Sequence, residues 1–428
     1  MPPSSAHQFR VVIVGGGPVG LCLAHALSHA GIEYVLLERR DSVVEESGFG
    51  LALWPHGVRI LDQLGLLEEA REIYLPMSDK YNYWPDGSEI SHNNLYDKRI
   101  LTSKKVISID SHAQGVKVRC DDGSVEEGSI VIGCDGVHSI VRGIMRELAL
   151  KSSAKTANVE RPMAAQYQLL AGHIRRIPNL EPNRLWEIRN NALSMQIFMS
   201  EDQGWFLIYK RLAAPAYQYT RYTDEDAEAF AKEIMDYPVM QGMKFRDLWD
   251  VRKWVRLVNI EEGIVKNWHW DRIVLVGDSA HKMTPNAGLS VNQGFQGVAA
   301  LTNILLKLLL KTPNPDTKAL TAAFGAYQAQ TEKGAKDSLW LSKLYTRTTS
   351  WHNILYKLAD FAGPYLGGDL VLFRTLASPI VMQGLVLDFL PEPGYKAGRL
   401  KWANKVSKEK RENGVVDGSL RQDHGKVS

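Results

Sequence analysis

Residues 11–20 read VVIVGGGPVG, and this stretch decides the fold of the 428-residue chain. Its four apolar, β-forming residues lead directly into Gly15, Gly17 and Gly20, which match the pattern G-x-G-x-x-G. A helical pattern rich in Ala and Leu follows, and a second apolar strand then ends at Glu38. This order of strand, glycine-rich turn, helix, strand and acidic residue predicts a unit that binds a dinucleotide.

Each residue of the pattern has a physical role in such a site. Gly15 lets the chain turn sharply, Gly17 lets the backbone approach a pyrophosphate, and Gly20 lets the helix pack closely on the sheet. The start of the helix presents N–H groups that have no partner within the helix, and these groups bind an anion. Glu38 stands at the end of the second strand, where its carboxylate accepts hydrogen bonds from ribose hydroxyls.

The composition is typical of a globular enzyme, with 45% hydrophobic and 23% charged residues. A net charge of only +3 gives no reason to expect a nucleic-acid partner. The three cysteines, Cys22, Cys120 and Cys134, lack the spacing of metal ligands. We therefore expect no metal site and a reducing, cytoplasmic environment. Residues 1–10 contain no apolar segment of the kind found in secretory signals.

The chain changes periodicity twice. From about Met163 the pattern is that of an antiparallel sheet, with strands expected at residues 166–172, 185–189, 194–199 and 205–210. An α/β pattern returns with the apolar strand 272–276, the sequence GDSAHKMTPNAG and a long helix over 289–311. The expected division is a dinucleotide-binding domain in two parts, 1–150 and 266–345, an inserted sheet-rich substrate domain, 151–265, C-terminal helices, 346–395, and a basic, solvated, partly disordered tail, 396–428.

The C-terminal helical patterns are apolar but interrupted by charged residues. Residues 366–390 contain Asp369, Arg374 and Asp388, which are too many charges for a lipid-exposed helix. We expect these helices to cover the substrate pocket or to make peripheral contact with a membrane surface without crossing the membrane.

Three motifs together resemble a known family. The sequences VVIVGGGPVG…LLERR, IVIGCDGVHSIVR and RIVLVGDSAHKMTPNAG are similar in order and spacing to those of the class A FAD-dependent monooxygenases. The resemblance is narrower to the fungal branch that epoxidises or hydroxylates prenylated indoles, meroterpenoids and polyketides, and it extends from about residue 9 to about residue 345. It implies an α/β fold like that of p-hydroxybenzoate hydroxylase, with a Rossmann-like FAD-binding domain.

The resemblance also implies the cofactors and the site. FAD would be reduced by NAD(P)H, and an oxygen atom of O2 would be transferred to an alkene or electron-rich ring of a small hydrophobic substrate. No catalytic residue is assigned, because the cofactor carries the chemistry. The residues that the family motifs place at the cofactor are Gly15, Gly17, Gly20, Glu38, Gly50, Asp135, Arg142, Asp278, Pro285, Gly288 and Val291.

The family motifs suggest distinct roles for these residues. Asp278 would bind a ribityl or ribose hydroxyl, and Pro285–Gly288 would aim the start of the long helix at the pyrimidine edge of the flavin. Asp135 and Arg142 would lie between FAD and the nicotinamide. Taken alone, Asp278 is equally compatible with a helix cap, and Asp135 with a plain turn.

Two sets of side chains have alternative interpretations. His138 and His281 lie inside the cofactor motifs, so a catalytic role for either is the less favoured interpretation. Five aromatic residues on the expected middle strands either line a pocket for a bulky apolar substrate or belong to the core, and core is the more common outcome at this spacing. These residues are Trp186, Phe198, Trp205, Phe206 and Tyr209.

The chain departs from the family pattern in three places. The sequence YDKR at 96–99 passes directly into ILT, where family members have a helix that begins with an FAD-contacting Arg. Lys98 and Arg99 are the nearest cations that can replace that Arg. Ser290 stands where the family has the second glycine of Gly-x-Gly-x-Asn, and Gln296 stands where it commonly has an acid.

These departures leave three hypotheses. The first is a working FAD- and NAD(P)H-dependent monooxygenase. The second is a flavoprotein-like scaffold that has lost redox chemistry and acts as a cyclase, an isomerase or a binding protein. The third is that the missing helix is an artefact of the gene model or of splicing. The retained Gly15, Glu38 and Asp278 favour the first hypothesis over the second.

Overall fold

The computed structural model describes residues 8–43, 52–68, 70, 79–81, 100–154, 156–178, 180–240, 242–366, 371–395 and 401–406. Gly50, the shortened join at 96–99 with Lys98 and Arg99, and Asp369 lie outside the described residues. So does the tail from residue 407 onward.

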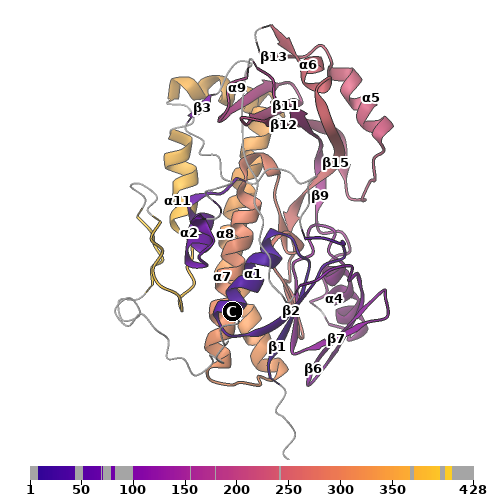
Figure 1. The fold of residues 1–428 in the computed structure, drawn as a ribbon, viewed down its shortest axis with the longest axis vertical. Helices are drawn as coiled ribbons and strands as arrows, with labels where there is room; N and C mark the ends of the chain where they lie inside the picture. The colour runs from indigo at the N-terminus through magenta and orange to yellow at the C-terminus, as the bar shows by residue number, and fades with distance from the viewer. Residues whose placement is uncertain are drawn as a thin grey trace, which may run out of the picture.

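A six-stranded sheet forms the centre of the first of two parts of the molecule (Figure 1). Both the N-terminal segment and residues 269–275 contribute strands to it. Its strands are mostly parallel and buried on both faces, which explains why they read as continuous apolar runs. In spatial order they are β16 (His269–Trp270), β17 (Ile273–Leu275), β8 (Ile130–Gly133), β1 (Arg10–Val14), β2 (Glu33–Leu37) and β4 (Ile100–Leu101).

Long helices pack around this sheet and share its core. The crossover helix α1 joins β1 to β2, and α7 packs on both α1 and α8. These helices are α1 (Pro18–His29), α7 (Leu289–Leu309) and α8 (Thr317–Thr349). The same part of the molecule includes α2 (Pro55–Gln63), α4 (Ile140–Lys151) and a small antiparallel sheet of β5 (Val106–His112), β6 (Gly115–Cys120) and β7 (Val125–Gly128). Cys22, Cys120 and Cys134 are all buried and free.

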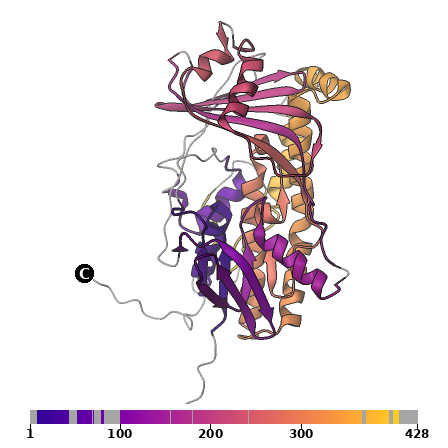
Figure 2. The same ribbon diagram turned by 90° about the vertical axis from the view of Figure 1, so that its right-hand side faces the viewer.

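A seven-stranded sheet forms the second part, and Figure 2 shows it above the first, with the long helix α8 reaching it from below. The four strands expected from the sequence are present and extended, whereas the long strand β15 was not anticipated. In spatial order the strands are β18 (His281–Lys282), β15 (Arg252–Ile264), β9 (Ala164–Arg175), β12 (Gln203–Ala216), β11 (Leu193–Met199), β10 (Arg184–Asn190) and β3 (Asp79–Tyr81). The expected α/β fold with an inserted antiparallel sheet and C-terminal helices is therefore confirmed.

One face of this sheet is apolar and packs under two helices, α5 (Asp224–Ile234) and α6 (Phe245–Trp249), and it is here called the helix-covered face after them. The hairpin of β13 (Pro238–Met240) and β14 (Met243–Lys244) lies beside these helices. Thr223 caps α5 through a capping box with Asp226, three residues further on. Phe206 is fully buried there, with its ring centroid 5.3 Å from that of Phe245. Gly172 makes room for it, because a Cβ at that position would overlap the Phe206 ring.

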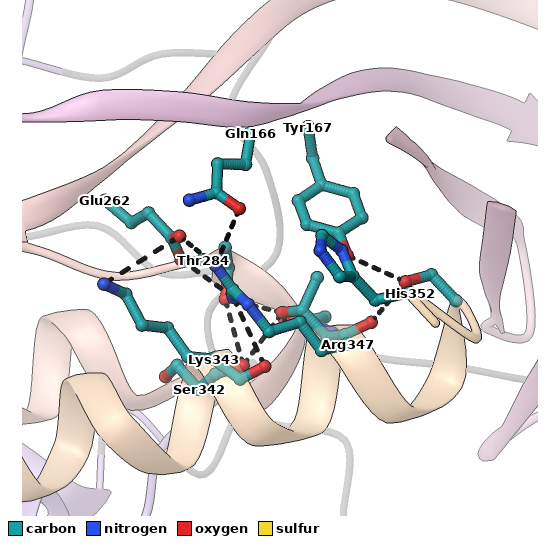
Figure 3. Close-up of polar contacts among 11 residues, drawn as sticks. Gln166, Tyr167, Glu262, Thr284, Ser342, Lys343, Arg347 and His352 are labelled. Carbon is teal, nitrogen blue, oxygen red and sulfur yellow. Dashed lines mark hydrogen bonds and ion pairs between the residues drawn. The ribbon is translucent and has the colours of Figure 1, made fainter. Parts of the chain in front are cut away.

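The opposite face, here called the inner face, points toward the C-terminal end of α8. Successive side chains of a strand point to opposite faces, so Glu187, Gln196 and Tyr209 share the inner face while their neighbours pack under α5 and α6. Figure 3 shows how α8 is fixed to this face. Arg347 pairs with the buried carboxylate of Glu262, at 2.5 and 3.3 Å.

The C-terminal region consists of short helices. A helix break lies at Gly363, where α9 (Ile354–Ala362) gives way to the 3-10 turn η3 (Gly363–Leu366). Pro379 does not break a helix but lies at the start of α11 (Ser378–Met382), which follows the π-helical turn η4 (Phe373–Ala377). None of the helices in the described ranges is long and apolar enough to cross a membrane.

The expectation of a solvated tail from residue 396 does not hold for residues 401–406. Arg59 of α2 is buried and donates to the carbonyl oxygen of Asn404 at 3.0 Å. Its guanidinium lies 4.2 Å from the ring centre of Trp402. Val406, four residues further along the chain, is buried as well. An indole and a buried cation therefore hold a segment that its basic composition marked as solvent-exposed.

Candidate functional site

The glycine-rich turn after β1 has the conformation that the sequence predicts. Gly15 has a φ of 106°, and a Cβ there would lie 2.5 Å from the carbonyl oxygen of Cys134. A Cβ at Gly20 would overlap the carbonyl oxygen of Gly15, so the helix and the turn approach as closely as backbone atoms allow. A Cβ at Gly17 would meet no protein atom within 4 Å, which leaves open space beside the start of α1.

Glu38 is 3% exposed and connects the end of β2 to this turn. Its Oε2 accepts a hydrogen bond from the Gly16 amide at 2.6 Å. Its Oε1 accepts from the backbone amide of Arg40 at 2.9 Å and from the Arg40 guanidinium at 3.1 Å. A carboxylate has about four lone-pair sites, so Glu38 can hold the turn in place and still accept a further hydroxyl.

Asp278 lies in the short 3-10 helix η1 (Gly277–Ser279), directly after β17. Its Oδ1 accepts from the hydroxyl of Ser290 at 2.5 Å, and its Oδ2 pairs with Lys282. Burial alone would raise the pKa of Asp278, but the charge of Lys282 and the two hydrogen bonds leave that pKa below its usual range. Asp278 is therefore a charged carboxylate, oriented by the serine that replaces the family glycine.

Asp135 caps α4. Its carboxylate accepts from the Ser139 hydroxyl at 2.6 Å and from the amides of Ile140 and Val141 at 2.8 and 3.1 Å. Burial raises the pKa of Asp135, and these hydrogen bonds act in the opposite direction. The carboxylate is thus bonded within the protein to the start of α4, whose N-cap residue is Ser139.

Arg142 joins two of the three sequence motifs. Its Nη1 donates to the carbonyl oxygen of Ser279 at 2.9 Å, and its Nη2 donates to that of Val137 at 2.6 Å. The turn after β8 and the turn after β17 are therefore fixed to each other at the same end of the sheet, where a doubly wound fold places its ligand.

The loop before α7 is the short 3-10 helix η2 (Pro285–Ala287). Gly288 follows in the left-handed conformation, with a φ of 64°, and no side chain caps the helix that starts after it. Val291, in the first turn of α7, is partly buried against the main core. The start of α7 consequently keeps backbone N–H groups that no side chain satisfies.

Two amide side chains of α7 hold neighbouring segments around this loop. Asn292 accepts from the Trp54 amide at 2.9 Å and donates to the carbonyl oxygen of Ala52 at 2.8 Å. Gln296 donates to the carbonyl oxygen of His56 and accepts from the Leu385 amide. A carboxylate could not donate the bond to the carbonyl oxygen of His56, so glutamine fits this position, where the family pattern that the sequence resembles implies an acid.

A buried polar network on the inner face reaches the same loop. Glu187 is 1% exposed and accepts from Gln196 at 3.0 Å and from the Tyr345 hydroxyl at 2.6 Å. Gln196 also accepts from the Tyr209 hydroxyl at 3.1 Å and donates to the carbonyl oxygen of Asn286 at 3.1 Å. The sheet, α8 and the loop before α7 are thus connected by one chain of hydrogen bonds.

The five aromatic residues divide between the two faces of the sheet. Trp186 and Phe206 belong to the core under α5 and α6, as the more common outcome implies. Phe198, Trp205 and Tyr209 lie on the inner face, and the first two are partly exposed. Tyr209 is fully buried in a small apolar cluster, so Phe198 and Trp205 are the pocket candidates among the five.

Comparison with known proteins identifies the family. The family model described as "FAD binding domain" matches residues 8–80 and 91–317. The FAD-dependent monooxygenase srdH of Neurospora crassa is 33% identical, over 93% of this chain and 99% of that protein. This chain belongs to the FAD-dependent monooxygenase family.

Solved structures agree with this monooxygenase at the level of the fold. HpxO of Klebsiella pneumoniae, complexed with FAD and uric acid, is 17% identical with a TM-score of 0.66, over 89% of this chain and 99% of that chain. The Diels-Alderase of pyrroindomycin biosynthesis is 21% identical with a TM-score of 0.62, over 87% and 80%. At these identities the likeness concerns the fold alone.

The cofactor of the monooxygenase is FAD, and the described residues fit it. Open space beside Gly17 adjoins the uncapped start of α1, and the start of α7 is uncapped as well. Asn286, in the loop before α7, carries a buried Nδ2 atom with no hydrogen-bond partner in the described part of the chain. These features are those of a protein surface shaped for a bound dinucleotide.

The sequence did not reveal the Glu187 network of this monooxygenase. Glu187 and Gln196 interrupt apolar strand segments, and an alternating pattern treats such polar residues as solvent-facing. A glutamate directly beside the tryptophan of a strand was the available signal, but only the position of α8 shows that the face is covered.

Proposed function

We propose that the protein uses NAD(P)H and O2 to epoxidise or hydroxylate a hydrophobic secondary-metabolite intermediate. The observation that carries this proposal is an apolar, partly exposed patch on the inner face, next to the loop before α7. FAD, when bound, supplies the redox chemistry that activates oxygen. The protein binds and orients the two reactants and keeps water out.

The pairing of strands β11 and β12 gives the position of this patch relative to the loop before α7. Gln196, which contacts the loop, lies directly opposite Leu207, and Phe198 lies directly opposite Trp205. Phe198, Trp205 and Leu207 are each partly exposed, although they share their face with fully buried side chains. Adjacent aromatic and aliphatic groups of this kind suit an alkene or a fused ring system better than a charged metabolite.

The residues at the ends of the parallel strands would hold FAD. Gly17 and the start of α1 would take the pyrophosphate, and Glu38 would accept from a ribose hydroxyl. Asp278 would accept from a ribityl hydroxyl, and Pro285, Gly288 and Val291 would adjoin the flavin ring. In the family motif Gly50 belongs to the same site, and Arg142 and Asp135 shape the turn on the nicotinamide side.

A second candidate is a scaffold that catalyses a cyclisation without redox chemistry. It is supported by the Diels-Alderase of pyrroindomycin biosynthesis, which shares this fold, and by Ser290 in place of a glycine beside Asp278. The apolar patch on the inner face suits a cyclisation of the same class of substrate. The two candidates differ in whether oxygen and electrons are consumed.

The deciding experiment offers the purified protein a panel of prenylated indoles, meroterpenoid precursors and polyketides. Each is incubated with FAD, NADPH and O2, and again with one of the three omitted. We expect product only in the complete mixture, with 18O from labelled O2 incorporated. Equal conversion under anaerobic conditions by colourless protein would reject the monooxygenase proposal in favour of the cyclase.

We further propose peripheral membrane contact through α9 and the segment after it. Leu355 and Leu358 on α9 are 71% and 59% exposed, and Lys357 stands between them. Tyr365 and Leu366 continue the apolar surface. Exposed aliphatic side chains beside a lysine suit an anionic lipid surface, which would also concentrate a hydrophobic substrate.

Flotation with liposomes that contain phosphatidylserine tests this contact. Leu355→Glu with Leu358→Glu should abolish co-flotation. The matched control is Val125→Glu with Val159→Glu, which places the same two charges on exposed apolar residues far from α9 in the sequence. Equal flotation of all three proteins, or none by the unmodified protein, would reject the proposal.

A further inference from the structure

Asn286 is held at two points by two different elements. Its carbonyl oxygen accepts from Gln196 of β11 at 3.1 Å. Its side-chain Oδ1 accepts from the hydroxyl of Thr346, in α8, at 2.7 Å. A loop residue fixed through both backbone and side chain has little freedom, so its remaining polar atom has a defined direction.

The remaining atom is Nδ2, the donor end of the amide. It is buried and has no hydrogen-bond partner among the described residues. A buried donor without a partner is costly, and such groups in native proteins are ordinarily satisfied by water or a ligand. Asn286 stands between Pro285 and the uncapped start of α7, so a ligand at this end of α7 is the natural partner.

Thr346 is itself fixed. Its hydroxyl lies 2.7 Å from that of Thr284 and 2.9 Å from the carbonyl oxygen of Ser342. The next residue, Arg347, is bound to Glu262 and Gln166 of the sheet, as Figure 3 shows. One turn of α8 therefore anchors the sheet on one side and orients the amide of Asn286 on the other.

We propose that the side-chain amide of Asn286 donates a hydrogen bond to a carbonyl oxygen on the pyrimidine edge of the bound flavin, with Thr346 as its positioning residue. The inference rests on the proposed placement of the flavin at the start of α7. That edge carries two carbonyl oxygens and gains negative charge on reduction, so a fixed donor there stabilises the reduced form. An oxygen atom of the substrate is the other acceptor that the same donor can serve.

The test measures the Kd of FAD by fluorescence titration and the midpoint potential of the bound flavin. Asn286→Leu, which keeps the volume and removes the donor, should raise the Kd about tenfold, the effect of about one net hydrogen bond. It should also lower the midpoint potential. Thr346→Val should shift both quantities in the same direction by a smaller amount, and Thr346→Ser should restore them.

The control is Asn191→Leu, the same change on an exposed turn. Unchanged Kd and potential in Asn286→Leu, with a raised KM for the substrate, would assign the donor to the substrate and overturn the proposal. No change in any of these quantities would overturn it as well. Thr346→Val carries the test if Asn286→Leu does not fold. Failure of the unmodified protein to bind FAD would instead refute the proposed function.

Discussion

The two faces of the seven-stranded sheet differ in the interactions that join each face to the helices packed on it. The helix-covered face is closed by apolar side chains from β9, β10, β11 and β12 packed under α5 and α6. The inner face carries only a small apolar cluster around Tyr167, Leu169 and Tyr209. It is joined to α8 by the hydrogen bond from Tyr345 to Glu187 and by the ion pairs of Glu262 with Arg347 and Lys343. The same strands supply both, because alternate residues point to opposite faces.

The difference separates stability from positioning. Apolar packing has no direction and stabilises in proportion to the area removed from water. Hydrogen bonds fix distances and angles but contribute little net free energy, since water competes for the same groups. If the sheet presents a substrate patch to the flavin as proposed, the hydrogen-bonded inner face sets the geometry of that patch and the opposite, apolar face supplies stability.

Phe206→Ala should give the largest loss of stability. The ring is fully buried among Phe245 and Trp249, so its removal leaves a cavity costing about 3–5 kcal/mol. Chemical denaturation followed by circular dichroism measures this loss, and the FAD Kd of the folded protein should stay unchanged. Trp205→Ala is the matched control on the inner face. If it destabilises the protein as much as Phe206→Ala, the two faces do not differ as described.

Arg347→Met should cost about 3 kcal/mol, because it removes the cation that is hydrogen-bonded to the buried carboxylate of Glu262 and leaves only Lys343, whose Nζ lies 3.9 Å away. Replacing both partners, as Glu262→Leu with Arg347→Met, should recover most of that stability. Turnover should not recover with it, since the pair also sets the position of α8. Recovery of both quantities in the double variant would show that the ion pair has no positioning role.

Acid should destabilise the protein through the buried, uncharged imidazole of His281. Burial lowers the pKa of His281, at the edge strand β18, to about 4, and neither ring nitrogen has a partner among the described residues. The unfolded chain takes up a proton near pH 6.5, so stability is complete above that pH and is lost as the pH falls toward 4.

At pH 5 the loss should be about 2 kcal/mol. His281→Asn should flatten the fall in denaturation midpoint between pH 6.5 and 4, whereas His112→Asn, on an exposed strand end, should not. His56, whose pKa burial also lowers to about 4, should account for part of the remaining fall. An unmodified protein with the same midpoint at pH 7 and pH 4.5 would contradict this account.

Tyr345→Phe should have the smallest effect. It removes the hydroxyl that donates to Glu187 and leaves Gln196 as a donor to the same carboxylate. The expected loss is about 1 kcal/mol, with a raised KM for the substrate if the network places the patch. Tyr217→Phe, on an exposed residue, gives the baseline. A change in stability without any change in KM would make the network purely structural.

The fold could be predicted where the pattern was local. The glycine turn, the strand before it and the capping box at Thr223 follow from conformational preferences that neighbouring residues determine. The four middle strands could be recognised by alternation, but the long β15 could not, because charged residues are spread along it. Its pairing with β9 supplies the apolar surroundings that its own sequence does not indicate.

The candidate site could be predicted only in part. Glu38 and Asp278 were assigned from motif position, and both lie at the ends of parallel strands. Their bonds to Gly16 and Ser290 were not foreseen, since those partners are 22 and 12 residues away. The role of Thr346 depends on a helix more than 50 residues from Asn286, and no sequence periodicity records such a distance.

The contacts that Arg59 makes with Trp402 and Asn404 have a practical consequence for anyone who shortens the protein. Composition suggests an end near residue 395, but that cut would remove Trp402 and the carbonyl group of Asn404 and expose a guanidinium that is now 1% accessible. Fusion partners and purification tags therefore belong after Val406. A family member whose chain ends earlier would need a different residue at the position of Arg59.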